Sequence, residues 1–228
     1  MFKKILIILF IVIPVDFWAQ KKDHEIGAFG GISYYMGDVN PGKIFYSVDP
    51  GFGLVYRLDL HSRYALRLSG IFGSLHGSDS NSKDQYQVIR NHSFRVPLTE
   101  FAAMIEYHFF DYIPESRYNF VTPYVTVGIG ALLLPVEENA FPVKPVIPFG
   151  IGGKYAINSR LGVSVEWTYR KTFTDYLDQL PNDAYTQAVS FANKQRSFLG
   201  SKDWYSFAGI SFTYKFALGG SKCPAYRY

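Results

Sequence analysis

The chain has 228 residues, of which 48% are hydrophobic, 18% aromatic and 18% charged, and 23 basic against 19 acidic residues leave a net charge of +4. This composition excludes intrinsic disorder, and the scattered basic residues argue against nucleic acid as the partner. The single cysteine excludes an internal disulfide framework and a cysteine-rich metal site.

The start of the chain has the pattern of an export signal. Lys3 and Lys4 precede an apolar run over 5–15, which is too short to cross a bilayer as a helix. Ala19 is the predicted cleavage position, so residues 1–19 form a signal peptide, with an uncleaved anchor as the alternative. The sequence therefore predicts an exported protein that folds outside the cytoplasm.

Beyond the signal, apolar and polar residues alternate with a period of two, and no apolar run is long enough for a transmembrane helix. The alternating segments are 25–36, 51–60, 63–75, 95–109, 122–133, 146–157, 161–173 and 203–216. Two architectures produce this pattern. A soluble sandwich turns its apolar face inward, whereas a membrane barrel turns that face to lipid and keeps a polar lumen.

Three features favour the barrel. Aromatic residues lie near both ends of the segments, glycines gather on the polar face, and short and long connections alternate. The sequence therefore predicts an all-β fold, an eight-stranded antiparallel transmembrane β-barrel of OmpA/OmpX-like size over residues 20–216, located in the cell outer membrane. An even strand number places both chain ends in the periplasm, including the C-terminal tail at 217–228.

Charged residues recur on the predicted inner face. They are Glu25, Arg57, Asp59, Arg67, Glu100, Glu106, Lys154, Glu166 and Arg170. Opposite charges in a narrow lumen are expected to pair, because an unpaired buried charge is costly. We predict a barrel-lumen charge cluster made of Arg57, Arg67, Glu100, Glu106, Glu166 and Arg170. A structural plug of salt bridges is the favoured interpretation, and a proton or ion relay is the alternative.

The sequence carries no catalytic or metal-binding pattern. The histidines lack metal-ligand spacing and are expected to be polar surface residues: His24, His61, His76, His92 and His108. Asp38, Asp175 and Asp178 lie in predicted loops, where turn formation is the favoured role and calcium binding the alternative. We therefore expect a non-enzymatic protein with no metal, no cofactor and no small-molecule substrate.

The longest predicted loop contains a helix-like segment at 181–195. Pro181 suits the first turn of a helix, and Tyr185, Ala188 and Ala192 recur at spacings of three and four. We expect a short helix there that caps the barrel mouth or binds a partner.

Several motifs stand out together. They are YYMGDVNP at 34–41, EYHFFDYIP at 106–114, TPYVTVGIGA at 122–131, PFGIGGKY at 148–155, EWTYRKTFTDYLD at 166–178, DWYSFAGISFTYKF at 203–216 and KCPAY at 222–226. In order and content they resemble the Bacteroidetes outer-membrane barrel family that contains PorG, a component of the type IX secretion system. The resemblance covers nearly all of the mature chain.

This resemblance implies an outer-membrane protein that contacts outer-membrane lipids and supports protein transport. Its implied partners are the periplasmic ring proteins, a PorK-like lipoprotein and a PorN-like ring protein. A standalone OmpX-like barrel acting in adhesion or envelope integrity is the alternative function.

Cys223 is the only cysteine, and it lies in the tail beyond the last predicted strand. In the oxidising periplasm a lone exposed thiol is liable to oxidise or to pair with a second chain, and an inert thiol is the alternative. The family resemblance implies an intermolecular disulfide from Cys223 to the PorK-like lipoprotein.

Overall fold

The structure of the protein is a computed structural model that describes residues 23–36, 44–45, 47–78, 93–114, 118–134, 143–173 and 204–217. Predictions for the signal peptide at 1–19, the helix at 181–195, and Asp38, Asp175, Asp178, His92 and Cys223 lie outside these residues. Within the described residues, no helix is long and apolar enough to cross a membrane.

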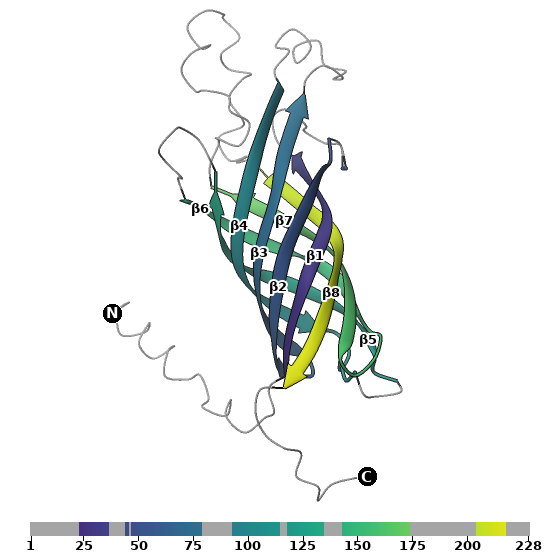
Figure 1. The fold of residues 1–228 in the computed structure, drawn as a ribbon. Helices are drawn as coiled ribbons and strands as arrows, with labels where there is room; N and C mark the ends of the chain where they lie inside the picture. The colour runs from purple at the N-terminus through teal and green to yellow at the C-terminus, as the bar shows by residue number, and fades with distance from the viewer. Residues whose placement is uncertain are drawn as a thin grey trace, which may run out of the picture.

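Eight strands account for most of the described residues. They are β1 (Asp23–Met36), β2 (Asp49–His61), β3 (Tyr64–Ser78), β4 (Ser93–His108), β5 (Val121–Leu133), β6 (Val143–Ala156), β7 (Leu161–Thr172) and β8 (Trp204–Ala217). Each strand pairs with the next one along the chain, and β1 also pairs with β8 in an antiparallel ladder. The sheet therefore closes into an up-and-down barrel without a free edge (Figure 1). The predicted fold class is confirmed.

The two ends of the barrel differ in their connections. At one end, called the turn end here, β1 begins, β8 finishes and the connections are 62–63, 109–120 and 157–160. At the opposite loop end, the connections are 37–48, 79–92, 134–142 and 173–203. The predicted alternation of short and long connections holds only in part, because 109–120 at the turn end has 12 residues, as many as 37–48 and more than 134–142 at the loop end. The strands extend one to three residues beyond several predicted ends.

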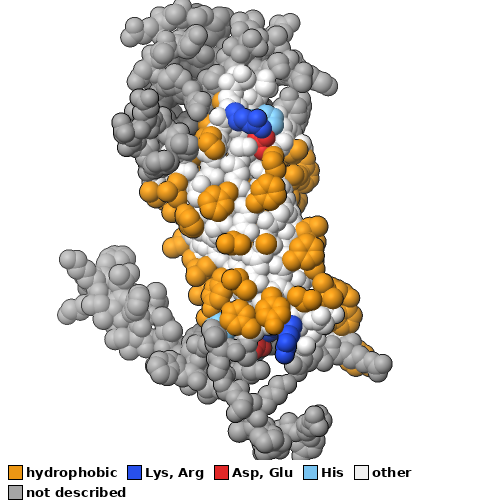
Figure 2. All heavy atoms as spheres, viewed as in Figure 1, with side chains coloured by type: hydrophobic (Ala, Val, Ile, Leu, Met, Phe, Trp, Pro, Cys, Tyr) orange, Lys and Arg blue, Asp and Glu red, His pale blue; other side chains and the backbone are white. Residues whose placement is uncertain are grey.

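Side chains alternate between the outer wall and the interior. On β2, Phe52 and Leu54 are 64% and 65% exposed, whereas Val55 and Arg57 are 2% and 0% exposed. On the face shown in Figure 2, hydrophobic side chains lie between charged groups that gather near the two ends. Such an apolar belt is the surface that lipid chains cover in an outer-membrane barrel.

Aromatic rings lie near both margins of this belt. Tyr64 and Tyr107, at the turn end, have ring centroids 5.3 Å apart. Phe149 and Trp204, towards the loop end, have ring centroids 5.9 Å apart. Because Tyr and Trp favour the membrane–water interface, these rings lie where interfacial girdles are expected.

The interior is divided into two parts. The charged half, at the turn end, contains Glu25, Arg57, Asp59, Arg67, Glu106, His108, Lys154 and Glu166. The apolar half, at the loop end, contains Phe29, Tyr35, Val55, Ile71, Leu75, Phe94, Val96, Leu98, Leu132, Leu134, Val146, Tyr205 and Phe207. The Arg170–Glu100 pair is buried beside the apolar half.

The prediction of a polar lumen is wrong for the loop end of the barrel. Apolar residues such as Phe29, Ile71 and Leu75 stand in the inward phase of their strands and are at most 2% exposed. The alternation rule assigns apolar residues to lipid, so it cannot detect hydrocarbon that fills the inside of a narrow barrel.

Candidate functional site in the barrel interior

The centre of the charged half is a pair of neighbouring arginines. Arg57 on β2 and Arg67 on β3 are opposite each other in the strand register, so their like charges must be offset from elsewhere in the barrel. Glu106 on β4 faces both. Arg57 Nε donates to the two carboxylate oxygens of Glu106 at 2.9 and 3.1 Å, and Arg67 Nη1 lies 3.3 Å from Glu106 Oε1.

A second carboxylate reaches the same arginines from the far wall. Glu166 on β7 accepts a hydrogen bond from Arg67 Nη1. Tyr124 on β5 donates its hydroxyl to Glu166 Oε2 at 3.0 Å. Ser164 Oγ, one inward position from Glu166, accepts from Arg57 Nη2 at 3.1 Å. The network thus ties β2 and β3 across the lumen to β4, β5 and β7.

Nearest the turn end, the basic side chains of the charged half are lysines instead of arginines. Lys154 Nζ lies 2.9 Å from Glu25 Oε2 and 3.7 Å from Asp59 Oδ1. Lys215 Nζ donates to Asp59 Oδ2 at 3.0 Å. The ring of Tyr112, in the 109–120 connection, lies under Lys154 with 4.5 Å from Nζ to the centroid. Burial raises the pKa of the Tyr112 phenol, so this ring stays neutral and closes the turn end of the lumen.

One ion pair lies among apolar side chains. Arg170 Nε on β7 donates to Glu100 Oε2 on β4 at 3.1 Å. The Tyr205 hydroxyl donates to the same oxygen at 2.6 Å, and the Arg170 guanidinium lies 4.5 Å from the Phe207 ring centroid. A fully buried pair requires such additional partners, because desolvation offsets much of its attraction.

The six residues of the predicted lumen cluster all lie inside the barrel, where they form two groups. Arg57, Arg67, Glu106 and Glu166 share one network, whereas Glu100 and Arg170 pair separately nearer the loop end. Sequence reasoning missed the tyrosines that complete these groups, Tyr112, Tyr124 and Tyr205. The sequence did carry a signal for Tyr124 and Tyr205, because both stand at inward positions in the alternation of β5 and β8.

His108 corrects the expectation that the histidines are surface residues. Its side chain is 1% exposed, and its Nε2 lies 3.6 Å from Glu106 Oε2. It occupies an inward position two residues after Glu106 on β4, so the strand period that buries Glu106 also buries His108. Among the described residues, no group of three or more His, Cys, Asp or Glu side chains is placed to hold a metal ion.

The chemistry of the network favours closure of the lumen over a relay. Arginine does not release its proton in proteins, and guanidinium groups stand at the centre of the charged half. Two buried nitrogens there, Arg57 Nη1 and Arg67 Nε, have no hydrogen-bond partner among the described residues. The fully buried guanidinium groups therefore favour the plug of salt bridges over the relay.

The closed barrel, its apolar outer wall and its filled interior define an outer-membrane β-barrel protein. Residues 3–225 match the family described as a domain of unknown function, DUF6089, and the chain belongs to this family. No curated protein matches the chain in sequence.

Solved structures of similar fold are small outer-membrane barrels. The N-terminal β-barrel domain of Pseudomonas aeruginosa OprF has 13% identity and a TM-score of 0.46, with 86% of this chain and 98% of that chain covered. Yersinia pestis Ail in complex with the heparin analogue sucrose octasulfate has 12% identity, a TM-score of 0.48, and coverage of 86% and 100%. The Pseudomonas aeruginosa outer membrane protein OprG has 11% identity, a TM-score of 0.42, and coverage of 87% and 98%.

Proposed function

We propose that this protein is a non-enzymatic outer-membrane anchor whose interior conducts nothing and whose turn end faces the periplasm. One observation carries the proposal: Arg57, Arg67 and Arg170, the largest charged side chains of the lumen, have no exposed surface. An eight-stranded barrel is just wide enough for side chains to fill it. The orientation is supported by two short connections at the turn end, 62–63 and 157–160, since such barrels have short periplasmic turns.

More specifically, we propose that the protein is a component of the type IX secretion system. It would associate with the periplasmic PorK-like lipoprotein and PorN-like ring protein and support export of cargo proteins. The support is the motif resemblance, of which RKTFTDYLD at 170–178 and the near-terminal cysteine are the most specific parts. A filled barrel is unsuited as the cargo conduit, so the anchor would act by attaching the ring to the membrane.

A deletion strain tests the secretion function. Cargo with type IX signals is expected to be retained in cells that lack the gene, and to return to the medium when the wild-type chain is expressed. Unchanged secretion in the deletion strain would contradict the finer proposal. If the strain then lost adhesion or became sensitive to detergent, the standalone OmpX-like alternative would be supported.

Planar-bilayer recording tests the closed interior independently of secretion. The purified wild-type barrel is expected to give no conductance steps under conditions in which a large porin, used as the control, gives them. Regular steps from the wild-type barrel would contradict an anchor that conducts nothing.

The proposed ring contact includes an intermolecular disulfide from Cys223, which lies outside the described residues. Non-reducing gels of membranes from wild-type and Cys223→Ala strains test it. A slower band is expected in the wild type alone, and it should disappear with reductant. Identical migration of the two proteins would reject the disulfide.

A further inference from the structure

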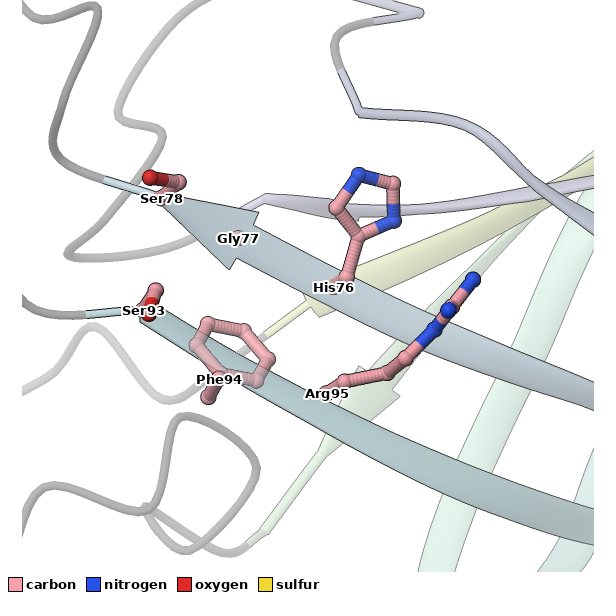
Figure 3. Close-up of a pocket in the computed structure, with 6 residues that line it drawn as sticks. All are labelled: His76, Gly77, Ser78, Ser93, Phe94 and Arg95. Atoms are coloured by element: carbon pink, nitrogen blue, oxygen red, sulfur yellow. The ribbon is translucent and has the colours of Figure 1, made fainter.

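A basic site lies on the outer wall at the loop end, away from the filled interior. His76 on β3 and Arg95 on β4 are opposite each other in the strand register, and both follow the outward phase of their strands. They line an open cavity of about 340 Å³ together with Gly77, Ser78, Ser93 and Phe94 (Figure 3). Figure 3 shows the His76 and Arg95 side chains projecting from adjacent strands on the same side of the sheet.

A buried carboxylate holds both basic groups. Asp49 is 3% exposed, its Oδ1 accepts from Arg95 Nη2 at 2.7 Å, and its Oδ2 lies 2.7 Å from His76 Nδ1. Since a carboxylate oxygen only accepts, Nδ1 of His76 carries the proton in this contact. The backbone of Asp49 is held in turn by its pairing with Ser33 in the β1–β2 ladder.

This arrangement presents donors outward and the carboxylate inward. The Arg95 side chain is 69% exposed and His76 is 35% exposed, whereas both oxygens of Asp49 are engaged. Among the described residues, the Arg95 side chain makes one hydrogen bond, and Arg95 lines the cavity with its other N–H groups unused by those residues. A guanidinium with unused N–H groups is suited to a phosphate, which it can bind through two parallel hydrogen bonds.

The height of the site along the barrel axis indicates which phosphate-bearing molecule it meets. His76 lies four residues beyond Phe72, an exposed ring of the apolar belt that is 53% exposed. Since strands rise about 3.3 Å per residue and tilt by roughly 40°, the site lies roughly 10 Å above that ring along the barrel axis. That is the level of lipid head groups, which Arg side chains reach by extending along the wall.

We propose that His76 and Arg95, held by Asp49, bind the phosphate-bearing head group of a lipid in the leaflet at the loop end. A phosphate there meets the N–H groups of Arg95 and, from the doubly protonated form of His76, the Nε2–H on the neighbouring strand. Its lipid chains lie along the apolar wall below them. The described part of the opposite rim has an arginine of another kind. Arg63, at the turn end, pairs with Asp111, and both side chains are exposed at 46% and 41%, so no buried carboxylate orients the guanidinium.

Lipid binding by the purified full chain tests the site. Native mass spectrometry in detergent would compare diphosphoryl lipid A with the same lipid after dephosphorylation. The wild type is expected to hold the phosphorylated lipid about tenfold more tightly, the scale of one charge-assisted hydrogen bond. The double variant Arg95→Gln with His76→Gln is expected to lose this preference, and each single variant to lose part of it. Arg63→Gln is the matched control and should bind like the wild type.

Three results would overturn the proposal. The first is equal binding of the phosphorylated lipid by the wild type and the double variant, and the second is an equal loss in Arg63→Gln. The third is displacement of the lipid by excess inorganic phosphate, which would assign the site to a free anion. Heat-modifiable gel migration identical to that of the wild type shows that each variant is folded, as expected for side chains on the outer wall.

Discussion

The charged half and the apolar half of the interior fill the same narrow cross-section in different ways. In the charged half, Arg57 Nε meets Glu106 at 2.9 Å and neither side chain has exposed surface. In the apolar half, Leu75 and Leu132 are equally buried, but their contacts have no preferred direction. The charged half is thus specified by pairing geometry, and the apolar half by volume.

This difference predicts two kinds of sensitivity. Removing one charge leaves its partner buried and unpaired, whereas removing hydrocarbon leaves a cavity whose cost depends on its size. Paired changes should therefore compensate in the charged half, and volume-conserving changes should be tolerated in the apolar half.

The largest expected effect is that of Arg57→Met in the charged half. The change removes a buried guanidinium that Glu106 and Ser164 contact, so the free energy of unfolding should fall by about 3–5 kcal/mol. Urea unfolding of the folded barrel in lipid vesicles measures it. The double variant Arg57→Met with Glu106→Gln should recover much of this loss, because it removes the uncompensated carboxylate as well. Equal losses in the single and double variants would break the distinction between the halves.

In the apolar half, Leu132→Ala is expected to lower the free energy of unfolding by about 2–5 kcal/mol, since the side chain is fully buried and leaves a cavity. Leu132→Met nearly conserves the volume and should cost less than about 1.5 kcal/mol. The same urea titration compares the two variants. A Met variant as unstable as the Ala variant would show that volume is not what specifies this half.

Gly128→Ala tests how tightly the barrel is packed where the charged half and the apolar half meet. A Cβ at Gly128 would lie 2.1 Å from the Ala103 carbonyl oxygen and 2.7 Å from Met104 Cα, so backbone must shift. We expect a loss of about 1–3 kcal/mol in the free energy of unfolding, as for other overpacked sites. Gly153→Ala on the outer wall is the control, because a Cβ there meets nothing within 4 Å. The idea of a tightly filled junction fails if both variants unfold at the same urea concentration.

The smallest expected effect is that of Asp111→Asn at the turn-end rim, outside both halves. The hydrogen bond from Arg63 holds the pKa of the Asp111 carboxyl below its ordinary value. Because the carboxyl has a lower pKa in the folded state than in the unfolded state, it stabilises the fold at any pH above its unfolded-state pKa. This contribution is lost as the pH falls through the folded-state pKa. The variant should therefore unfold slightly earlier than the wild type at neutral pH, and the difference should vanish in acid. A difference that grew in acid would contradict the pairing.

The strands were predictable because period-two alternation is a local property of the chain. Three of the eight predicted segments lie wholly within the observed strands, and each of the other five extends one residue beyond a strand at one end. The charges of the lumen were predictable for the same reason. Glu106 and Arg170, for example, stand in the polar phase of their strands, so a barrel turns them inward.

The pairing of those charges was not predictable, because it depends on which strands face each other across the lumen. Arg57 and Glu166 are far apart in the chain, and their shared network exists only after β1 pairs with β8 and closes the sheet. The Asp49 contacts with His76 and Arg95 likewise depend on the register of β3 against β4 and on the position of the first residue of β2.

By itself, the sequence determined the number of strands, their approximate boundaries and which Arg and Glu residues turn inward, since these follow from a local alternation that membrane and lumen impose on every strand. Only the tertiary structure showed that half of the interior is filled by apolar side chains. Phe29 and Ile71 are apolar, yet they stand at inward positions of their strands, where the alternation rule expects polar residues. The tertiary structure also decided that Tyr34, on the outer wall, is buried beneath Phe45, whose φ is 59°. Closure of the barrel sets which residues share a cross-section, and no local pattern carries that information.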